Sequence, residues 1–136
     1  MDDLYAAIAT AGSGLQSQGR RMRIVTENIA NANTTAASPN EDPYRRKLIT
    51  FRNVLDKQSG SELVKVRRIS EDSNAFKLKY EPGHPAANQD GYVKYPNVNS
   101  LIEFADMREA QLSYQANLNI ISSTRQMVQR TIDLLR

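Results

Sequence analysis

The first part of the chain carries a regular stripe of apolar or small residues. Its members recur at alternating steps of four and three residues, and one of them is polar: Leu4, Ile8, Ala11, Leu15, Gln18, Met22, Val25, Ile29 and Ala32. This spacing is typical of a heptad seam along one side of an α-helix. Because acidic residues suit the positive end of a helix, we predict a helix from Asp2 or Asp3 to about Asn31–Asn33.

The last part of the chain carries a second stripe with nearly the same step. It consists of Phe104, Met107, Gln111, Tyr114, Leu118, Ile121, Arg125, Val128, Ile132 and Leu135. Ser100 and Glu103 have the spacing of a capping box at a helix start. The pattern therefore predicts a second helix from about Leu101 to Leu135, a length that is typical of coiled-coil or assembly elements.

These two helices are expected to pair with each other. Each stripe covers one side of its helix, so neither helix should be stable alone. The predicted fold is mainly α with a small β region, in which two long terminal helices pair as an antiparallel coiled coil. Its predicted domains are the N-terminal helix over 1–35, a linker and short β-rich region over 36–99, and the C-terminal helix over 100–136.

The middle of the chain changes to a strand-like period. Residues 36–43 are small, polar and Pro-containing, and we interpret them as a linker. Short stretches with strand character follow, separated by Gly and Pro: Tyr44–Phe51, Leu63–Ile69, Phe76–Tyr80 and Gly91–Tyr95. We expect three or four short strands, joined in one or two hairpins.

Three glycines fall inside the first predicted helix, at positions 12, 14 and 19. Each costs about 1 kcal/mol relative to Ala in a helix interior. Two explanations stay open from the sequence. The glycines either give the helix local plasticity or allow a neighbouring helix to approach where a Cβ would clash.

The composition offers almost no catalytic chemistry. The chain of 136 residues has no cysteine and one histidine, His84, in a turn-like Glu-Pro-Gly-His-Pro stretch. No set of nucleophile, base and orienting residue can be assembled, and we expect His84 to be solvated or packed against an aromatic ring. We predict no catalytic residues, no cofactor and no metal site, and hence not an enzyme.

The charge pattern is mildly basic and does not indicate a polyanion. The formal net charge is +3, and basic clusters at 20–23, 45–47 and 67–68 have acidic residues nearby. Contacts to acidic residues of neighbouring subunits are favoured over nucleic-acid binding. The sequence shows no membrane span and starts without the pattern of a secretion signal, which by itself indicates a cytoplasmic protein.

Several short motifs resemble one known family. Ser13-Gly14-Leu15, Gln18, Arg21-Met22 and Glu27–Thr35 closely resemble the N-terminal signature of flagellar basal-body rod and hook proteins. Tyr114–Asn117 resembles the C-terminal helix motif of that family, and Tyr44–Lys47 with Tyr95–Asn99 is similar to its proximal-rod type. The resemblance spans nearly the whole chain.

The resemblance implies a structural subunit of the proximal rod, the drive shaft that transmits torque for motility. Its partners would be other rod subunits and basal-body proteins, copies of itself, and the type III export apparatus during secretion. The family is exported without a cleaved signal peptide, which moves the expected location from the cytoplasm to the periplasmic rod. The weak net charge and the lack of a long apolar run predict no nucleic-acid partner and no membrane insertion. An alternative from another class is a small helical adaptor or chaperone of the export system.

The assembly interface is predicted along both helices, from the apolar stripes and from the family motifs. Its candidate residues are Leu4, Ile8, Leu15, Met22, Val25, Ile29, Asn31, Asn33, Tyr114, Gln115, Asn117, Leu118, Ile121, Val128, Ile132 and Leu135. In the middle, Tyr44–Phe51 and Phe76–Tyr80 are candidates for lateral contacts.

Overall fold

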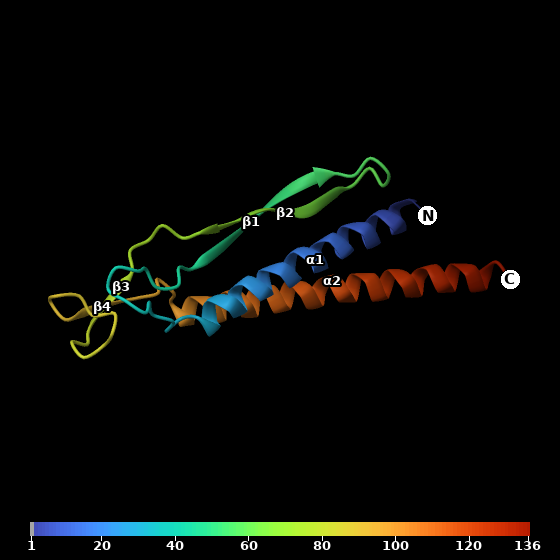
Figure 1. Cartoon of the computed structure of the whole chain (residues 1–136). Coiled ribbons are helices and arrows are strands. Elements are labelled where there is room, and N and C mark those ends of the chain that lie inside the picture. Colours follow the sequence, from blue (N-terminus) through green and yellow to red (C-terminus); the bar gives the residue numbers. More distant parts are fainter. Residues whose placement is uncertain (1) are drawn as a thin grey trace. The chain divides into compact units, whose positions relative to one another are not determined.

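The computed structural model describes residues 2–136 and contains two long helices separated by four strands (Figure 1). In chain order the elements are α1 Asp2–Ala30, β1 Lys47–Leu55, β2 Glu62–Glu71, β3 Lys77–Tyr80, β4 Tyr92–Tyr95 and α2 Ser100–Leu134. The predicted fold class, mainly α with a small β region between terminal helices, is confirmed. Neither of the helices described is long and apolar enough to cross a membrane.

The strands form two separate two-stranded sheets, β1 with β2 and β3 with β4. In the second sheet the strands are antiparallel, with Lys77 opposite Tyr95 and Tyr80 opposite Tyr92. A tight turn joins β1 to β2, in which Asp56 N–H donates to the carbonyl of Ser61 over 2.8 Å. The predicted strands and hairpins are therefore confirmed, with their ends shifted by a few residues.

The start of α2 differs from the prediction. Asn99 caps the helix, because its Oδ1 accepts a hydrogen bond from the backbone N–H of Leu101 over 3.1 Å. The capping box expected for Ser100 and Glu103 is wrong. Glu103 directs its carboxylate to Arg46 and Asn28 and does not return to the helix start.

The chain forms two compact units, each assembled from distant parts of the sequence. The first contains α1 as far as Met22, Thr50–Arg68 and Arg108–Arg136. The second contains Arg23–Ile49 and Ile69–Met107. Each long helix therefore contributes residues to both units.

In the first unit, α1 contacts the β1–β2 hairpin and α2 (Figure 1). Arg21 donates to the Glu109 carboxylate over 3.1 Å, whereas Gly14 faces Asn117, so the two helices run in opposite directions there. A Cβ on Gly14 would lie 2.6 Å from Asn117 Nδ2, which explains this glycine as a site of close approach. A Cβ on Gly12 would have no atom of the described chain within 4 Å.

The apolar core is small for a chain of this length. Its fully buried members are short or β-branched side chains, namely Ala11, Ile24, Val25, Ala86, Val93, Val98 and Ala110. Five polar or charged residues of the part that the structure describes are buried as well, Ser17, Asn28, Asp72, Glu103 and Thr124. Because a buried polar group is costly unless it is hydrogen-bonded, the bonded residues Ser17, Asn28, Asp72 and Glu103 mark contacts that define the fold.

Candidate assembly surfaces and the buried polar junction

Two serines of α1 bind the backbone N–H and C=O of one hairpin residue, Val64, in the first unit. Ser13 Oγ accepts from the backbone N–H of Val64 over 3.1 Å, and Ser17 Oγ donates to the Val64 carbonyl over 3.0 Å. The two hydroxyls stand four residues apart, so they share one side of α1. Ser13 Oγ also donates to the carbonyl of Thr10 over 2.7 Å, which fixes its orientation.

Asn28 plays the corresponding part in the second unit. Its Oδ1 accepts from Lys47 N–H over 2.9 Å and from Tyr44 Oη over 2.8 Å. Its Nδ2 donates to the Lys47 carbonyl over 2.9 Å and to Glu103 Oε2 over 3.1 Å. All four hydrogen-bonding positions of this buried amide are therefore occupied.

Glu103 extends this contact into a charged network. Its side chain is fully buried, and its second oxygen accepts from Arg46 Nε. The Arg46 guanidinium also lies 3.4 Å from an Asp72 carboxylate oxygen and 3.5 Å from one of Asp106. We name Asn28, Arg46, Asp72 and Glu103 the polar junction. It joins α1, the residue before β1, the residue after β2 and α2, and each buried charge in it has a partner of opposite sign.

The polar junction changes the titration of its member Arg46 and of Tyr44, which donates to Asn28. Burial, followed by the charges of Glu27 and Glu103, raises the pKa of the Tyr44 phenol to about 12. Burial acts to lower the pKa of Arg46, but the hydrogen bond and charge of Glu103 outweigh it, so the net shift is upward. Both residues therefore keep their protons and donate to acceptors of the junction over the physiological pH range.

A backbone contact holds two loop motifs together beside the junction. Arg46 N–H donates to Asn97 Oδ1 over 2.8 Å, and Asn97 Nδ2 donates to the carbonyls of Asp72 and Asn74 over 3.1 and 3.0 Å. The Arg45 guanidinium donates to the same two carbonyls. The chain segments before β1 and before α2 are thereby held in one position relative to the end of β2.

His84 has a structural role. Its Nδ1 accepts from the backbone N–H of Ala86 over 3.0 Å, and its Nε2 lies 3.3 Å from Thr35 Oγ1. The imidazole connects the turn after β3 to the segment that follows α1. Within residues 2–136, no group of three or more acidic, histidine or cysteine side chains is placed to hold a metal ion.

The buried face of α2 follows a heptad that the sequence stripe shares only in part. Its most buried positions are Glu103, Ala110 and Thr124, spaced by seven or fourteen residues, with half-buried Asn117 between the last two. The predicted stripe instead contains the residue that follows each of these positions, such as Leu118 after Asn117, and Leu118 is 39% exposed. Small and polar residues therefore occupy the inner position, and larger apolar residues stand beside it.

In the first unit, these apolar side chains form two rows on α2. Ile120, Met127 and Leu134 recur every seven residues and are all exposed. We name this row the first flank. Leu118 and Ile132, with the exposed Arg125 midway between them, form the second flank, which lies on the other side of the buried positions when α2 is viewed along its axis. An exposed pair of apolar rows is expected where other protein surfaces pack.

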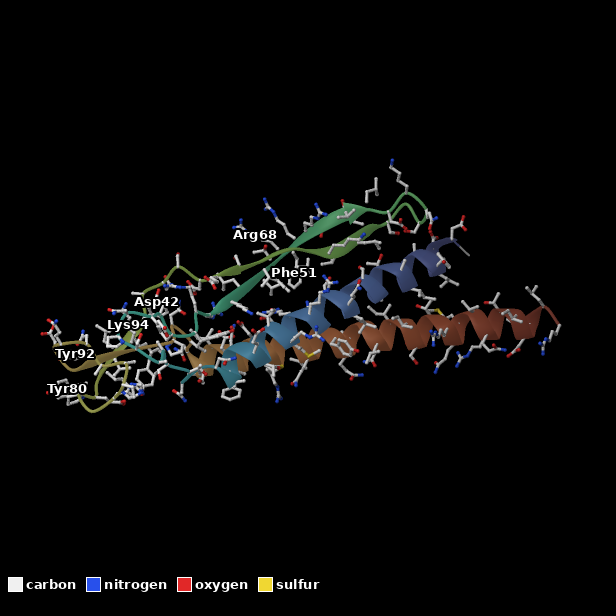
Figure 2. The ribbon with its side chains drawn as sticks, viewed as in Figure 1. Asp42, Phe51, Arg68, Tyr80, Tyr92 and Lys94 are labelled. Carbon is white, nitrogen blue, oxygen red and sulfur yellow. The ribbon has the colours of Figure 1, made fainter. Side chains whose placement is uncertain are left out.

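The β3–β4 sheet also has an exposed face. Leu78, Tyr80 and Tyr92 are exposed on it, and the two tyrosine rings meet edge to face with centroids 5.4 Å apart (Figure 2). Gly91 adopts φ +85°, and a Cβ there would lie 2.8 Å from the ring of Tyr80. The opposite face of this sheet contributes Val93, which is fully buried.

Comparison with known proteins identifies the family. Residues 8–37 match the family model described as flagella basal body rod protein, and residues 89–134 match the C-terminal region of the flagellar basal body rod FlgEFG proteins. The flagellar basal-body rod protein FlgC of Agrobacterium fabrum is 57% identical over 136 residues, covering 100% of this chain and 98% of that protein. The chain belongs to the FlgC family of flagellar basal-body rod proteins.

More distant members of the FlgC family align over nearly the same length. The protein of Salmonella typhimurium is 36% identical over 124 residues, which cover 91% of this chain and 92% of that protein. The protein of Bacillus subtilis is 35% identical, with 96% and 97% of the two chains covered. The chain is therefore a structural subunit of the flagellar basal-body rod, and of the two alternatives from the sequence this result favours the rod subunit over the export adaptor.

The structure gives a physical explanation for the N-terminal motif at residues 27–35, through which the sequence resembles rod and hook proteins. In the stretch 27–35, Glu27 forms an ion pair with Lys47, while Asn28 binds four partners. Asn31 Nδ2 donates to the Glu27 carbonyl over 2.9 Å, and Thr34 Oγ1 donates to Asn31 Oδ1 over 3.2 Å. These contacts end α1 and position the chain that leads to β1.

The predicted interface residues differ in their exposure within the chain. Val25 is buried, and Asn33, Gln115, Leu118, Ile132 and Leu135 are exposed. The others are half-buried, namely Leu4, Ile8, Leu15, Met22, Ile29, Asn31, Tyr114, Asn117, Ile121 and Val128. Their role in contacts between subunits stays a prediction.

Sequence reasoning missed the polar junction and the first flank. Glu103 was assigned to helix capping, and Arg46 was treated as one of a basic cluster. The only available signal was a lone acidic residue on the inner face of a helix whose other inner positions are small. Ile120, Met127 and Leu134 repeat every seven residues, but they lie beside the stripe that was chosen.

Proposed function

We propose that this rod subunit assembles helically, with copies of itself and with other rod subunits, into the proximal part of the shaft that transmits torque for motility. The observation that carries the proposal is the pair of apolar flanks on α2. A two-fold symmetric dimer uses one surface patch on both partners. Two separate patches on one helix favour contacts between unlike patches, which extend into a helical filament when they do not close into a ring.

In this assembly, residues 1–35 and 100–136 form a coiled-coil core, and residues 36–99 give lateral contacts. The opposite directions of α1 and α2 in the first unit support an antiparallel pairing, as does the close approach at Gly14. The exposed tyrosine face of β3–β4 and the segment Tyr44–Phe51 are the candidates for lateral contacts. Phe51 lies on the side of the hairpin that faces α1, and Arg68 lies on the opposite side (Figure 2).

Family membership supports the cellular setting of the proposal. The subunit is exported by the flagellar type III apparatus without a cleaved signal peptide, and it joins other basal-body proteins in the periplasmic rod. Its role is mechanical, with no catalytic step, no cofactor and no nucleic-acid partner. The polar junction supports such a role, because hydrogen-bonded buried ion pairs fix the geometry of the elements they join.

The flanks can be tested with a matched pair of variants. Met127→Asp places a carboxylate in the first flank, whereas Gln126→Asp places one on the exposed polar side of α2. Burial of one large apolar side chain contributes about 1.5–3 kcal/mol to an interface, and a buried unpaired charge adds a further cost. We expect Met127→Asp to abolish rod incorporation and swimming in soft agar, with Gln126→Asp close to wild type.

Secretion and folding are controls in this experiment. Both substituted positions are exposed, so the circular dichroism of the purified variants and their export into the medium should stay unchanged. Normal motility of Met127→Asp, with normal amounts of the variant in isolated basal bodies, would count against the assembly role of the first flank.

A further inference from the structure

A groove between α1 and β2 in the first unit is lined by two cations. It has a volume of about 250 Å³, and its walls are Gln16, Ser17, Arg20, Lys65 and Val66. We name it the basic groove. Arg20 and Lys65 are exposed, and neither makes a salt bridge to any described residue. Lys65 has a longer-range electrostatic interaction with Asp56.

The chemistry of this groove fits a carboxylate. A guanidinium offers two parallel N–H donors to the two oxygens of a carboxylate, and an ammonium adds a point charge at the same place. The amide of Gln16 supplies a further donor, since its side chain is exposed and has no partner among the described residues. Ser17 is already bonded to Val64, so it forms the wall and does not compete for the ligand.

The hairpin adds more positive charge around the groove. Arg52, Arg67 and Arg68 are exposed and form no salt bridge with a described residue. The first unit contains eleven Lys and Arg residues but six Asp and Glu residues. The second unit has the opposite balance, with seven Lys and Arg against nine Asp and Glu. The two units of one chain are thus complementary in charge.

The second unit also presents carboxylates at its surface. The loop before β1 and the turn before β4 line a shared groove of about 590 Å³ that includes Asn40 and Asp90. Glu41 and Asp42 follow Asn40 directly, and we name Glu41, Asp42 and Asp90 the acidic rim. Asp42 is paired with Lys94 over 3.3 Å, where Figure 2 shows the two side chains close together. Glu41 and Asp90 are exposed, and neither forms a salt bridge with a described residue.

We propose that the basic groove of one subunit receives a carboxylate from the acidic rim of a second copy of the chain. The inference deepens the proposed function and rests on it, because it names a contact between neighbouring copies in the rod. Groove and rim are different surfaces, so the contact is head-to-tail and can repeat from copy to copy. It is a charge-assisted contact that is distinct from the apolar flanks.

Site-directed cross-linking tests this contact directly. The chain has no cysteine, so an introduced one reacts at a single position. Gln16→Cys lies in the groove wall and Asn40→Cys lies beside the rim, and neither replaces a charged residue. The two variants carry different tags and are produced in the same cells, and isolated basal bodies are treated with a short bis-maleimide. We expect a product of about twice 15.3 kDa that carries both tags.

Charge reversal shows whether ion pairing holds the two sites together. Arg20→Glu with Lys65→Glu in the groove-bearing copy should reduce the mixed-tag product to background. Glu41→Lys with Asp90→Lys in the other copy should restore it. A cysteine on the polar side of α2, Gln126→Cys, replaces the groove cysteine as the control and should give no mixed-tag product.

The outcomes separate this proposal from the proposed function. Motile cells whose basal bodies contain both tagged chains but no mixed-tag product would overturn the contact and leave the rod assembly standing. A cross-link from the groove only to a protein of another mass would overturn the second copy as the occupant. Loss of the product on charge reversal, with its return in the swapped pair, would establish the contact.

Discussion

Replacing Asn28 by Asp exchanges one amide nitrogen for an oxygen at the centre of the polar junction. The residue is 1% exposed, and the substitution hardly changes its volume. The two bonds that Oδ1 accepts, from Lys47 N–H and Tyr44 Oη, can persist. The two bonds that Nδ2 donates cannot persist, because a carboxylate oxygen would then lie opposite the Lys47 carbonyl at 2.9 Å and the Glu103 carboxylate at 3.1 Å.

The magnitude follows from these two contacts. A buried polar atom left without its hydrogen bond costs about 1–3 kcal/mol, and each of the two acceptors loses its donor. The new charge strengthens the two remaining bonds but lies beside Glu103, so we expect a net loss of about 4 kcal/mol in the free energy of unfolding. For a chain of 136 residues, this corresponds to a melting temperature lower by roughly 10–15 °C.

The loss should depend on pH. Burial and the neighbouring Glu103 both disfavour ionisation of the introduced carboxyl, so its pKa in the folded state lies above its unfolded value of about 3.9. A group with a raised folded pKa binds its proton more tightly in the native state. The variant is therefore closest to wild type in acid, and the difference grows as the pH rises through the folded pKa.

Thermal unfolding of the purified variant, followed by circular dichroism between pH 4 and pH 8, measures both effects. Asn33→Asp is the matched control, because Asn33 belongs to the same motif but is exposed. It should change the melting temperature by little at any pH. A melting temperature of Asn28→Asp within 2 °C of wild type at pH 7, or a difference that grows toward acid, would refute the reasoning.

Three further results are expected. Gly91→Ala should lower the free energy of unfolding by about 1–2 kcal/mol because of the positive φ of Gly91, and further because the new Cβ would clash with the ring of Tyr80. Gly83→Ala, whose Cβ would meet no neighbouring atom within 4 Å, should leave the free energy of unfolding nearly unchanged in the same assay. In an alkaline titration of phenolate absorbance, the step near pH 12 should disappear in Tyr44→Phe, and the stability that this phenol contributes should be lost as the pH rises through that value. The double replacement of Leu118 and Ile121 by Asp should abolish rod incorporation while export continues, and normal motility would contradict it. Because Leu118 is exposed and Ile121 is half-buried, the single Leu118 variant should keep its fold.

The helices and strands could be predicted because their patterns are local. The heptad step of the terminal stripes and the short alternating stretches between them gave the order and type of every element. The inner face of α2 could not be chosen correctly from hydrophobicity. Asn117 occupies it where α1 approaches closely at Gly14, and only this tertiary contact shows that a larger residue would not fit there.

The polar junction could not be predicted from the sequence because it also depends on tertiary contacts. Asn28 and Glu103 are 75 residues apart, and each has ordinary local explanations as a helix-end or helix-start residue. Their burial depends on the arrival of β1 and on the guanidinium of Arg46 between two acidic side chains. The resemblance to the rod family marked Asn28 as part of a motif, but it did not indicate what the side chain binds.

The side chains of α1 have one more consequence for a protein that builds a rod. A two-stranded hairpin leaves the outer edge of each strand open to pairing with strands of other chains, which is how cross-β fibres grow. Here hydroxyls of Ser13 and Ser17 occupy the N–H and C=O of Val64 on β2. The amide of Asn28 does the same to the peptide groups of Lys47 on β1. Strand addition is therefore blocked at these two residues, which favours assembly through side-chain surfaces over backbone pairing between strands.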